Sequence, residues 1–215
     1  HASKYTKGTT ATVKSSLPIS TKTSEIIYDP DTQRCVVFYR DTTQSNVGYA
    51  NVIQGTGTTA SPTVSVGSAS QFSNGDEVVS NKTMNATYDT QNDKIFMCWA
   101  NTDGNINSYR GAIITVTGGS TNTLSANGWA DIWDYGTSNN GSYASAVYDE
   151  NKNNIIFYYR DDSNSDYLTY KTITSGSSSF TVANGSVIQQ SNLYFSGIGS
   201  KFASGKGIVL ITEDE

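Results

Sequence analysis

The residues best suited to bind a ligand lie close together in one aromatic segment of the chain. This segment contains two of the three tryptophans, with acidic residues among them: Trp129, Asp131, Trp133, Asp134 and Tyr135. Aromatic rings beside carboxylates can stack on sugar faces and bind hydroxyls, and they also anchor protein interfaces. We therefore predict a carbohydrate-binding or partner-binding loop here. The alternative is that the tryptophan pair only anchors this loop between neighbouring structural units.

No combination of side chains indicates catalysis. His1 is the only histidine, which excludes a hydrolytic triad with a histidine base. Carboxylates alone could act on glycans, but acid catalysis needs paired carboxylates in unlike environments. The candidates instead recur at equivalent repeat positions, which favours a structural role: Asp41, Asn101, Asp161 and Asp214. We therefore expect a protein without enzymatic activity.

Three acidic turns present oxygen atoms at alternate positions, as a calcium loop does. They lie at residues 29–33, 89–93 and 149–154, and they lack the invariant glycine and the closing glutamate of a known loop. Asp and Asn are also favoured in tight turns for local backbone reasons. We expect structural turns, with no metal and no cofactor.

Four asparagines begin Asn-x-Ser/Thr sequons, the acceptor pattern for N-linked glycans. They are Asn81, Asn85, Asn140 and Asn184. Their predicted positions in loops or at strand edges would permit glycosylation in a eukaryotic secretory host. The abundance of Asn, Ser and Thr also accounts for this number by chance.

The composition restricts the class of partner. Of 215 residues, 56 are Ser or Thr and 19 are Asn, whereas only 15% are charged and the formal net charge is -5. Nucleic acid is not an expected partner, because phosphates require a basic surface. No apolar stretch is long enough for membrane insertion. Polarity that comes from hydroxyls and amides favours an extracellular or cell-surface protein.

A repeat of 60 residues organises the chain. Its marker is a Tyr-Asp pair, which occurs at Tyr28-Asp29, Tyr88-Asp89 and Tyr148-Asp149. A polar turn and then an apolar run follow each pair, at residues 35–39, 95–99 and 155–159, and a fourth run lies at residues 208–211. Short apolar runs of β-branched and aromatic residues are typical of strands that are covered on both faces.

Each unit is predicted to be a four-stranded antiparallel meander. Third strands are indicated at residues 48–53, 109–115 and 167–173, and weaker fourth strands at 64–66, 123–125 and 180–182. We expect the remaining length in loops at residues 54–62 and 126–142. The single domain then divides into residues 1–23 as partial outer strands, three repeats at 24–81, 82–141 and 142–197, and a partial fourth repeat at 198–215.

Such units bury their sheets only by stacking on one another. The Tyr-Asp pair, polar turn, apolar run, Arg40-Asp41 and a strand led by Gly48-Tyr49 together resemble tandem β-propeller-type repeats of secreted, cell-surface and phage-fibre proteins. The resemblance covers nearly the whole chain and implies binding or scaffolding more often than catalysis. Ala100-Asn101 departs from the Arg-Asp pattern. We expect an all-β, four-bladed β-propeller-like fold.

The fourth unit is expected to be split between the two ends of the sequence. It has only its first two strands at residues 198–215, while residues 9–13 and 17–19 resemble short third and fourth strands. Pairing of these segments would remove two open sheet edges. It would close a ring within one chain, or build a head-to-tail filament between chains. The alternative is a fragment of a longer array.

Together these patterns predict a non-enzymatic extracellular structural or adhesive repeat protein that assembles into filaments through strand complementation. The alternative function is that of a lectin, with Trp129 and Trp133 at its binding site. The expected partners are other copies of the chain and glycans.

Overall fold

The computed structural model describes residues 8, 10–15, 23–58, 61–80, 82–103, 106–119, 121–135, 143–189, 195–203 and 206–213. Within them, the regular structure is antiparallel β-strand apart from two single-turn 3-10 helices, Thr42–Gln44 (η1) and Asp162–Asn164 (η2). This confirms the predicted all-β class. Among these residues there is no helix with the length and hydrophobicity needed to cross a bilayer.

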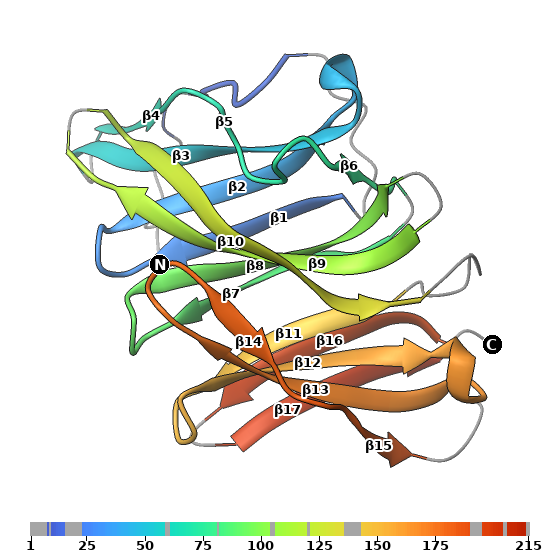
Figure 1. The fold of residues 1–215 in the computed structure, drawn as a ribbon. Helices are drawn as coiled ribbons and strands as arrows, with labels where there is room; N and C mark the ends of the chain where they lie inside the picture. Colours follow the sequence, from blue (N-terminus) through green and yellow to red (C-terminus); the bar gives the residue numbers. More distant parts are fainter. Residues whose placement is uncertain are drawn as a thin grey trace.

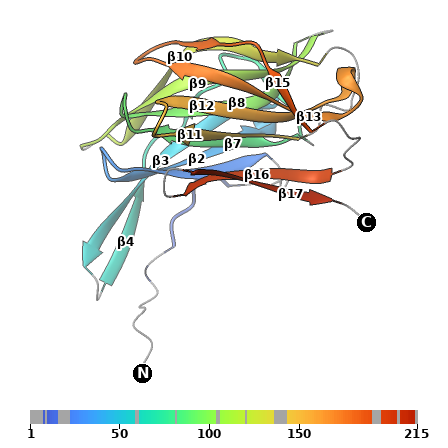
Figure 2. The same cartoon turned by 90° about the horizontal axis from the view of Figure 1, so that it is seen from below.

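Unit 1 is built on the first Tyr-Asp repeat and contains β1 (Ser24–Asp29), β2 (Arg34–Asp41), β3 (Val47–Thr58), β4 (Ser61–Val66), β5 (Ser70–Gln71) and β6 (Glu77–Val78). β4 pairs with the far half of β3 and β5 with the near half, so the fourth position of the meander is divided. β3 and β4 form a hairpin that projects from the body (Figure 2). The loop that we predicted at residues 54–62 is therefore mostly strand.

The remaining strands follow the same order. Unit 2 contains β7 (Met84–Asp89), β8 (Lys94–Asp103), β9 (Ile106–Thr117) and β10 (Thr123–Asp134). Unit 3 contains β11 (Ala144–Asp149), β12 (Asn154–Asp161), β13 (Tyr167–Ser175), β14 (Phe180–Val182) and β15 (Ser186–Gln189), and unit 4 contains β16 (Phe195–Ala203) and β17 (Lys206–Glu213). β16 begins three residues before the predicted boundary at residue 198.

The register confirms that the Tyr-Asp pairs occupy equivalent places. Tyr28 pairs with Cys35, Tyr88 with Ile95 and Tyr148 with Ile155, each time at the penultimate position of the first strand. The first strands also lie side by side, since β1 packs against β7, β7 against β11 and β11 against β16. In Figure 1 units 1 and 2 form the upper group of strands, and units 3 and 4 form the lower group.

The core lies between units, as a repeat with two apolar faces requires. Ile95, Met97 and Trp99 of β8 pack in one cluster with unit 1, and the alternate residues Phe96 and Cys98 pack in a second cluster with unit 3. All five side chains are at most 1% exposed. Strand β8 is therefore covered on both faces, which confirms the prediction from its apolar run.

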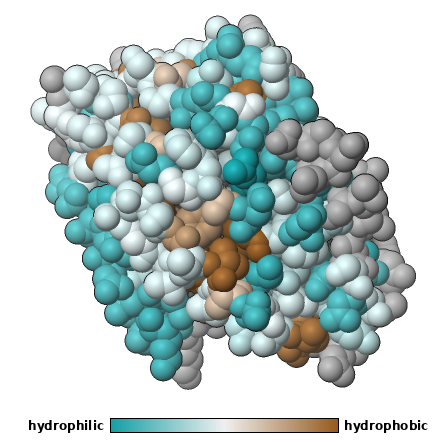
Figure 3. Space-filling view, in the orientation of Figure 1, coloured by the Kyte–Doolittle hydropathy of each residue, from teal (hydrophilic) through white to brown (hydrophobic). Residues whose placement is uncertain are grey.

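The outer surface is mainly hydrophilic (Figure 3). A hydrophobic area lies near the middle of the face shown, where the two groups of strands meet. A smaller one lies over β15, whose Val187 and Ile188 are 36% and 49% exposed. These areas are small, in keeping with a surface dominated by Ser, Thr and Asn.

The two ends of the chain do not pair in the described residues. Residues 10–13 belong to no strand, and Lys14 forms an ion pair of 2.7 Å with Asp41 at the end of β2. β17 pairs with β16 in a two-stranded sheet. Residue 9 and residues 17–19, which we predicted to contribute to the split unit, lie outside the described part of the chain.

Candidate functional site

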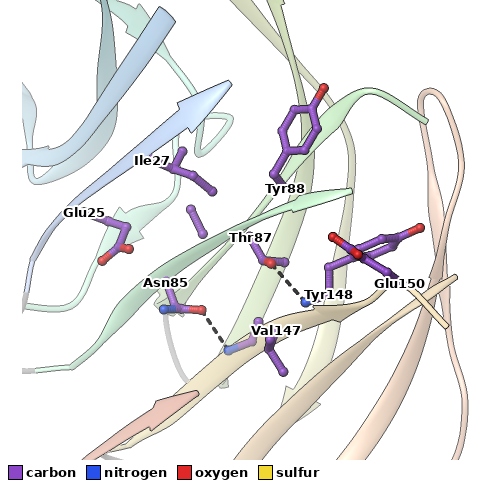
Figure 4. Close-up of a pocket in the computed structure, with 10 residues that line it drawn as sticks. Glu25, Ile27, Asn85, Thr87, Tyr88, Val147, Tyr148 and Glu150 are labelled. Atoms are coloured by element: carbon purple, nitrogen blue, oxygen red, sulfur yellow. Dashed lines mark hydrogen bonds between the residues drawn. The ribbon is translucent and has the colours of Figure 1, made fainter. Parts of the chain in front are cut away.

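A groove of about 260 Å³ lies where the first strands of units 1, 2 and 3 meet. It runs across β1, β7 and β11, so each strand contributes polar and apolar side chains to its walls (Figure 4). The residues that matter for its chemistry are Glu25, Ile27, Asn85, Thr87, Tyr88, Tyr148 and Glu150. The groove is the clearest candidate for a binding site.

On one side of the groove, side chains of β7 bind the backbone of β11. Three backbone amides of β11 donate to alternate side chains of β7 and of Thr83, the residue before it: Ala144 to Thr83 Oγ1 at 3.1 Å, Ala146 to Asn85 Oδ1 at 2.8 Å and Tyr148 to Thr87 Oγ1 at 3.0 Å. These bonds satisfy the edge of β11 that faces away from β12. We call this contact the β7–β11 seam.

On the other side, between β1 and β7, the equivalent positions carry different residues. Glu25 stands where β7 has Asn85, and Ile27 stands where β7 has Thr87. An isoleucine cannot accept a hydrogen bond, and the Glu25 carboxylate forms no hydrogen bond or ion pair with the described residues. Burial raises the pKa of Glu25 to about 7. This β1–β7 seam is therefore open at the positions where the β7–β11 seam is bonded.

The Tyr-Asp turns at one end of these strands are stabilised locally. Asp29 accepts hydrogen bonds from the backbone amides of Asp31 and Thr32 at 3.0 and 3.3 Å, and Asp89 and Asp149 accept equivalent amide bonds. Each turn ends in a residue with positive φ: Gln33 at 56°, Asp93 at 53° and Asn153 at 51°. This supports the structural role of these aspartates that the sequence suggested.

Two tyrosines at the groove have altered acidity. Burial raises the pKa of Tyr88, and the nearby carboxylates of Asp29 and Asp93 raise it further. Burial and the carboxylate of Asp89 raise the pKa of Tyr148 in the same way. Both phenols therefore stay protonated at neutral pH, and they can contribute to the groove as uncharged rings and as hydrogen-bond donors.

The aromatic segment predicted as a loop is part of strand β10, and this prediction was wrong in its local structure. Register shifts occur between Asn127 and Ala130 and between Asp131 and Trp133, so the regular alternation of the strand is interrupted twice. Gly128 has φ of 67° at the first of these shifts. Such bulges change the direction in which side chains point within a strand. Because the alternation of apolar and polar residues is interrupted, the sequence pattern did not indicate a strand here.

The rings of this segment are used mainly inside the protein. Trp133 and Tyr135 are only 6% and 5% exposed and belong to the core between units 2 and 3. Trp133 stacks on Tyr109, and the half-buried Trp129 donates its indole N–H to the carbonyl of Phe72 at 2.7 Å. This agrees with the alternative that the tryptophans anchor the segment between units.

The acidic residues of the segment are more exposed than its rings. Asp131 accepts a hydrogen bond from Ser108 at 3.0 Å and lies 3.3 Å from Nε of Arg110, and Asp134 is exposed. The rings of Trp133 and Tyr135 are buried, so they do not form an exposed surface beside these carboxylates. Glycan binding by this segment stays a prediction. The exposed pair of tryptophan rings on which that prediction was based is not present, because Trp133 is buried.

The four sequons differ in accessibility. Asn184 is exposed in the loop after β14. Asn85 is half-buried in β7, and its side chain holds the β7–β11 seam, which argues against a glycan on its nitrogen. Asn81 and Asn140 lie outside the described residues.

Sequence reasoning missed the groove and its Glu25. A signal was available, because alignment of the three Tyr-Asp pairs puts Glu25, Asn85 and Ser145 in equivalent positions and only one of them is charged. What the sequence could not show is that first strands of successive units lie side by side. Comparison of the chain with protein-family models, curated proteins and solved structures gave no match.

Proposed function

We propose that this chain is a non-enzymatic structural or adhesive module, secreted or borne on a cell surface. Its four units are arranged in a propeller-like manner, with the first strands around a common axis. The packing of β1 on β7, β7 on β11 and β11 on β16 supports this arrangement. The module assembles with further copies by strand complementation, in which a strand of one copy completes the sheet of the next.

The strand pairing of unit 4 is the observation that carries this proposal. β2, β8 and β12 each lie between two strands of their own unit, whereas β17 pairs with β16 alone in the described residues. Its sequence contains Ile208, Val209, Leu210 and Ile211, an apolar run like those of the covered strands. An apolar strand with an unpaired edge is a template for another strand.

The exposure of unit 1 supports the same proposal. Ile26 and Tyr28 of β1 are 62% and 54% exposed, whereas the equivalent Ala146 and Tyr148 of β11 are each 3% exposed, because unit 2 covers them. The face of unit 1 that a preceding unit would cover is thus largely open. It offers a second copy an apolar surface next to the strand edge.

Deletion of residues 1–20 tests the proposal. The full chain is expected to form species heavier than one chain whose mass rises with protein concentration, and filaments in electron micrographs. The deletion removes both predicted donor strands and should give a monomer, while a control deletion of residues 1–7 keeps them and should still assemble. Added peptide of residues 1–22 should shorten the filaments of the full chain. A full chain that stays monomeric at all concentrations would refute self-assembly.

A further inference from the structure

Two polar side chains face one another across the β1–β7 side of the groove without bonding. Asn85 uses its Oδ1 to accept the amide of Ala146 at 2.8 Å, so its Nδ2 remains as a donor. In Figure 4 this nitrogen lies on the side of Asn85 that faces Glu25. Neither Nδ2 of Asn85 nor the Glu25 carboxylate bonds another described residue. A donor and an acceptor are therefore left without a partner in the same groove.

The backbone of β7 adds two further donors. Its register with β8 is the same as that of β11 with β12, and in β11 the amides of Ala146 and Tyr148 point away from the neighbouring strand. Hydrogen-bonded and non-hydrogen-bonded pairs alternate in an antiparallel ladder. The amides of Ala86 and Tyr88 therefore point toward β1. The amide of Ala86 faces the position of Glu25, and the amide of Tyr88 faces Ile27, which cannot accept a bond.

These groups define the chemistry of an occupant. The atom between Glu25 and Asn85 must donate to a carboxylate and accept from an amide, and a hydroxyl group does both. An ammonium group has no acceptor. A carboxylate has no proton to donate. Phosphate and carboxylate anions would both be repelled by Glu150, by the ionised form of Glu25 and by a net charge of -5.

The size and walls of the groove restrict the occupant further. A volume of about 260 Å³ accommodates a single small ring rather than a long oligomer. Ile27 and Val147 provide apolar contacts beside the polar groups, and the ring of Tyr88 lies at the same groove. Small-molecule sites commonly combine such apolar walls with a few polar groups that fix orientation.

We propose that the groove between β1, β7 and β11 binds a neutral pyranose sugar, one hydroxyl of which bridges Glu25 and Asn85. Other hydroxyls of the ring accept bonds from the amides of Ala86 and Tyr88. This site is separate from the aromatic segment of β10, and it does not depend on assembly between copies.

Titration of the full chain with methyl glucoside, methyl galactoside and methyl mannoside tests the site. A ligand of this size has an expected dissociation constant on the order of 1 mM. At least one sugar should bind saturably, with amide NMR shifts at Ala86 and Tyr88. Ethylammonium chloride serves as the cationic probe and should not bind.

Three variants of the groove and one control variant locate the binding. Glu25→Ala removes the acceptor and should weaken affinity by about tenfold or more, while Glu25→Gln retains an acceptor oxygen and should lose less. Asn85→Asp keeps the bond to Ala146 but removes the donor, and it should weaken affinity by a similar factor. Trp129→Phe should bind as the unmodified chain does.

Three results would overturn the proposal. The first is the absence of saturable binding by all three sugars in a folded chain. The second is binding of ethylammonium in their place. The third is binding that is lost in Trp129→Phe and retained in the Glu25 and Asn85 variants, which would locate the sugar at β10.

Discussion

Glu25 couples the stability of the protein to pH. Burial raises the pKa of its carboxyl from 4.5 to about 7. The folded chain therefore holds this proton more tightly than the unfolded chain. Protonation of Glu25 therefore adds to the free energy of unfolding. This contribution is fully present below pH 4.5 and is lost as the pH rises through 7. Tyr88 of β7, Tyr148 of β11 and Glu150 in the turn after β11 are the other titratable groups at this groove.

Replacement of Glu25 by Gln should remove this pH dependence. The difference in free energy of unfolding between pH 4.5 and pH 7.5 is expected to shrink by on the order of 1–3 kcal/mol, because glutamine does not titrate. Urea unfolding at several pH values measures the change. Glu150→Gln, at an exposed turn position of the same groove, is the control and should keep the original profile. If the free energy of unfolding depended on pH in the same way in the unmodified chain and in Glu25→Gln, Glu25 would not be the source of the pH dependence.

At the scale of the elements, the β7–β11 seam depends on side chains that accept backbone bonds. Thr87→Val keeps the shape of the residue and removes the Oγ1 atom that accepts the amide of Tyr148 at 3.0 Å. Loss of an acceptor for a buried amide should lower the free energy of unfolding by about 1–3 kcal/mol. Thr181→Val, at an exposed position of β14, is the matched control and should change stability by less than about 0.5 kcal/mol. Chemical unfolding measures both, and equal effects would refute the role of the seam.

The strands could be predicted from the sequence only in part. The repeated Tyr-Asp pairs correctly predicted equivalent first strands, because each pair sits at the same register beside a covered second strand. Residues 64–66, 123–125 and 180–182 also lie in strands, as predicted. β10 was missed beyond residue 125, since its two register shifts break the alternation on which a strand prediction relies. Glu25 was missed because its surroundings come from strands 60 and more residues away, which no local pattern encodes.

At the scale of the whole molecule, the units stabilise one another. Unit 2 buries Met97 and Trp99 against unit 1 and Phe96 against unit 3, and all three side chains are 0% exposed. A fragment of residues 82–135 would present both of these faces to water. We expect this fragment to be unfolded, with a poorly dispersed NMR spectrum, while the full chain unfolds in one cooperative transition. A well-dispersed spectrum for the fragment would show that one unit is stable alone.

The projecting hairpin of β3 and β4 is a suitable site for the insertion of foreign peptides. Residues 55–58 are exposed and contribute no side chain to either core cluster. A foreign epitope inserted at the hairpin tip would stand clear of the stacked units. In a polymer of linked copies, one epitope per subunit would then be displayed in evenly spaced rows, an arrangement that multivalent receptors and antibodies engage with high avidity.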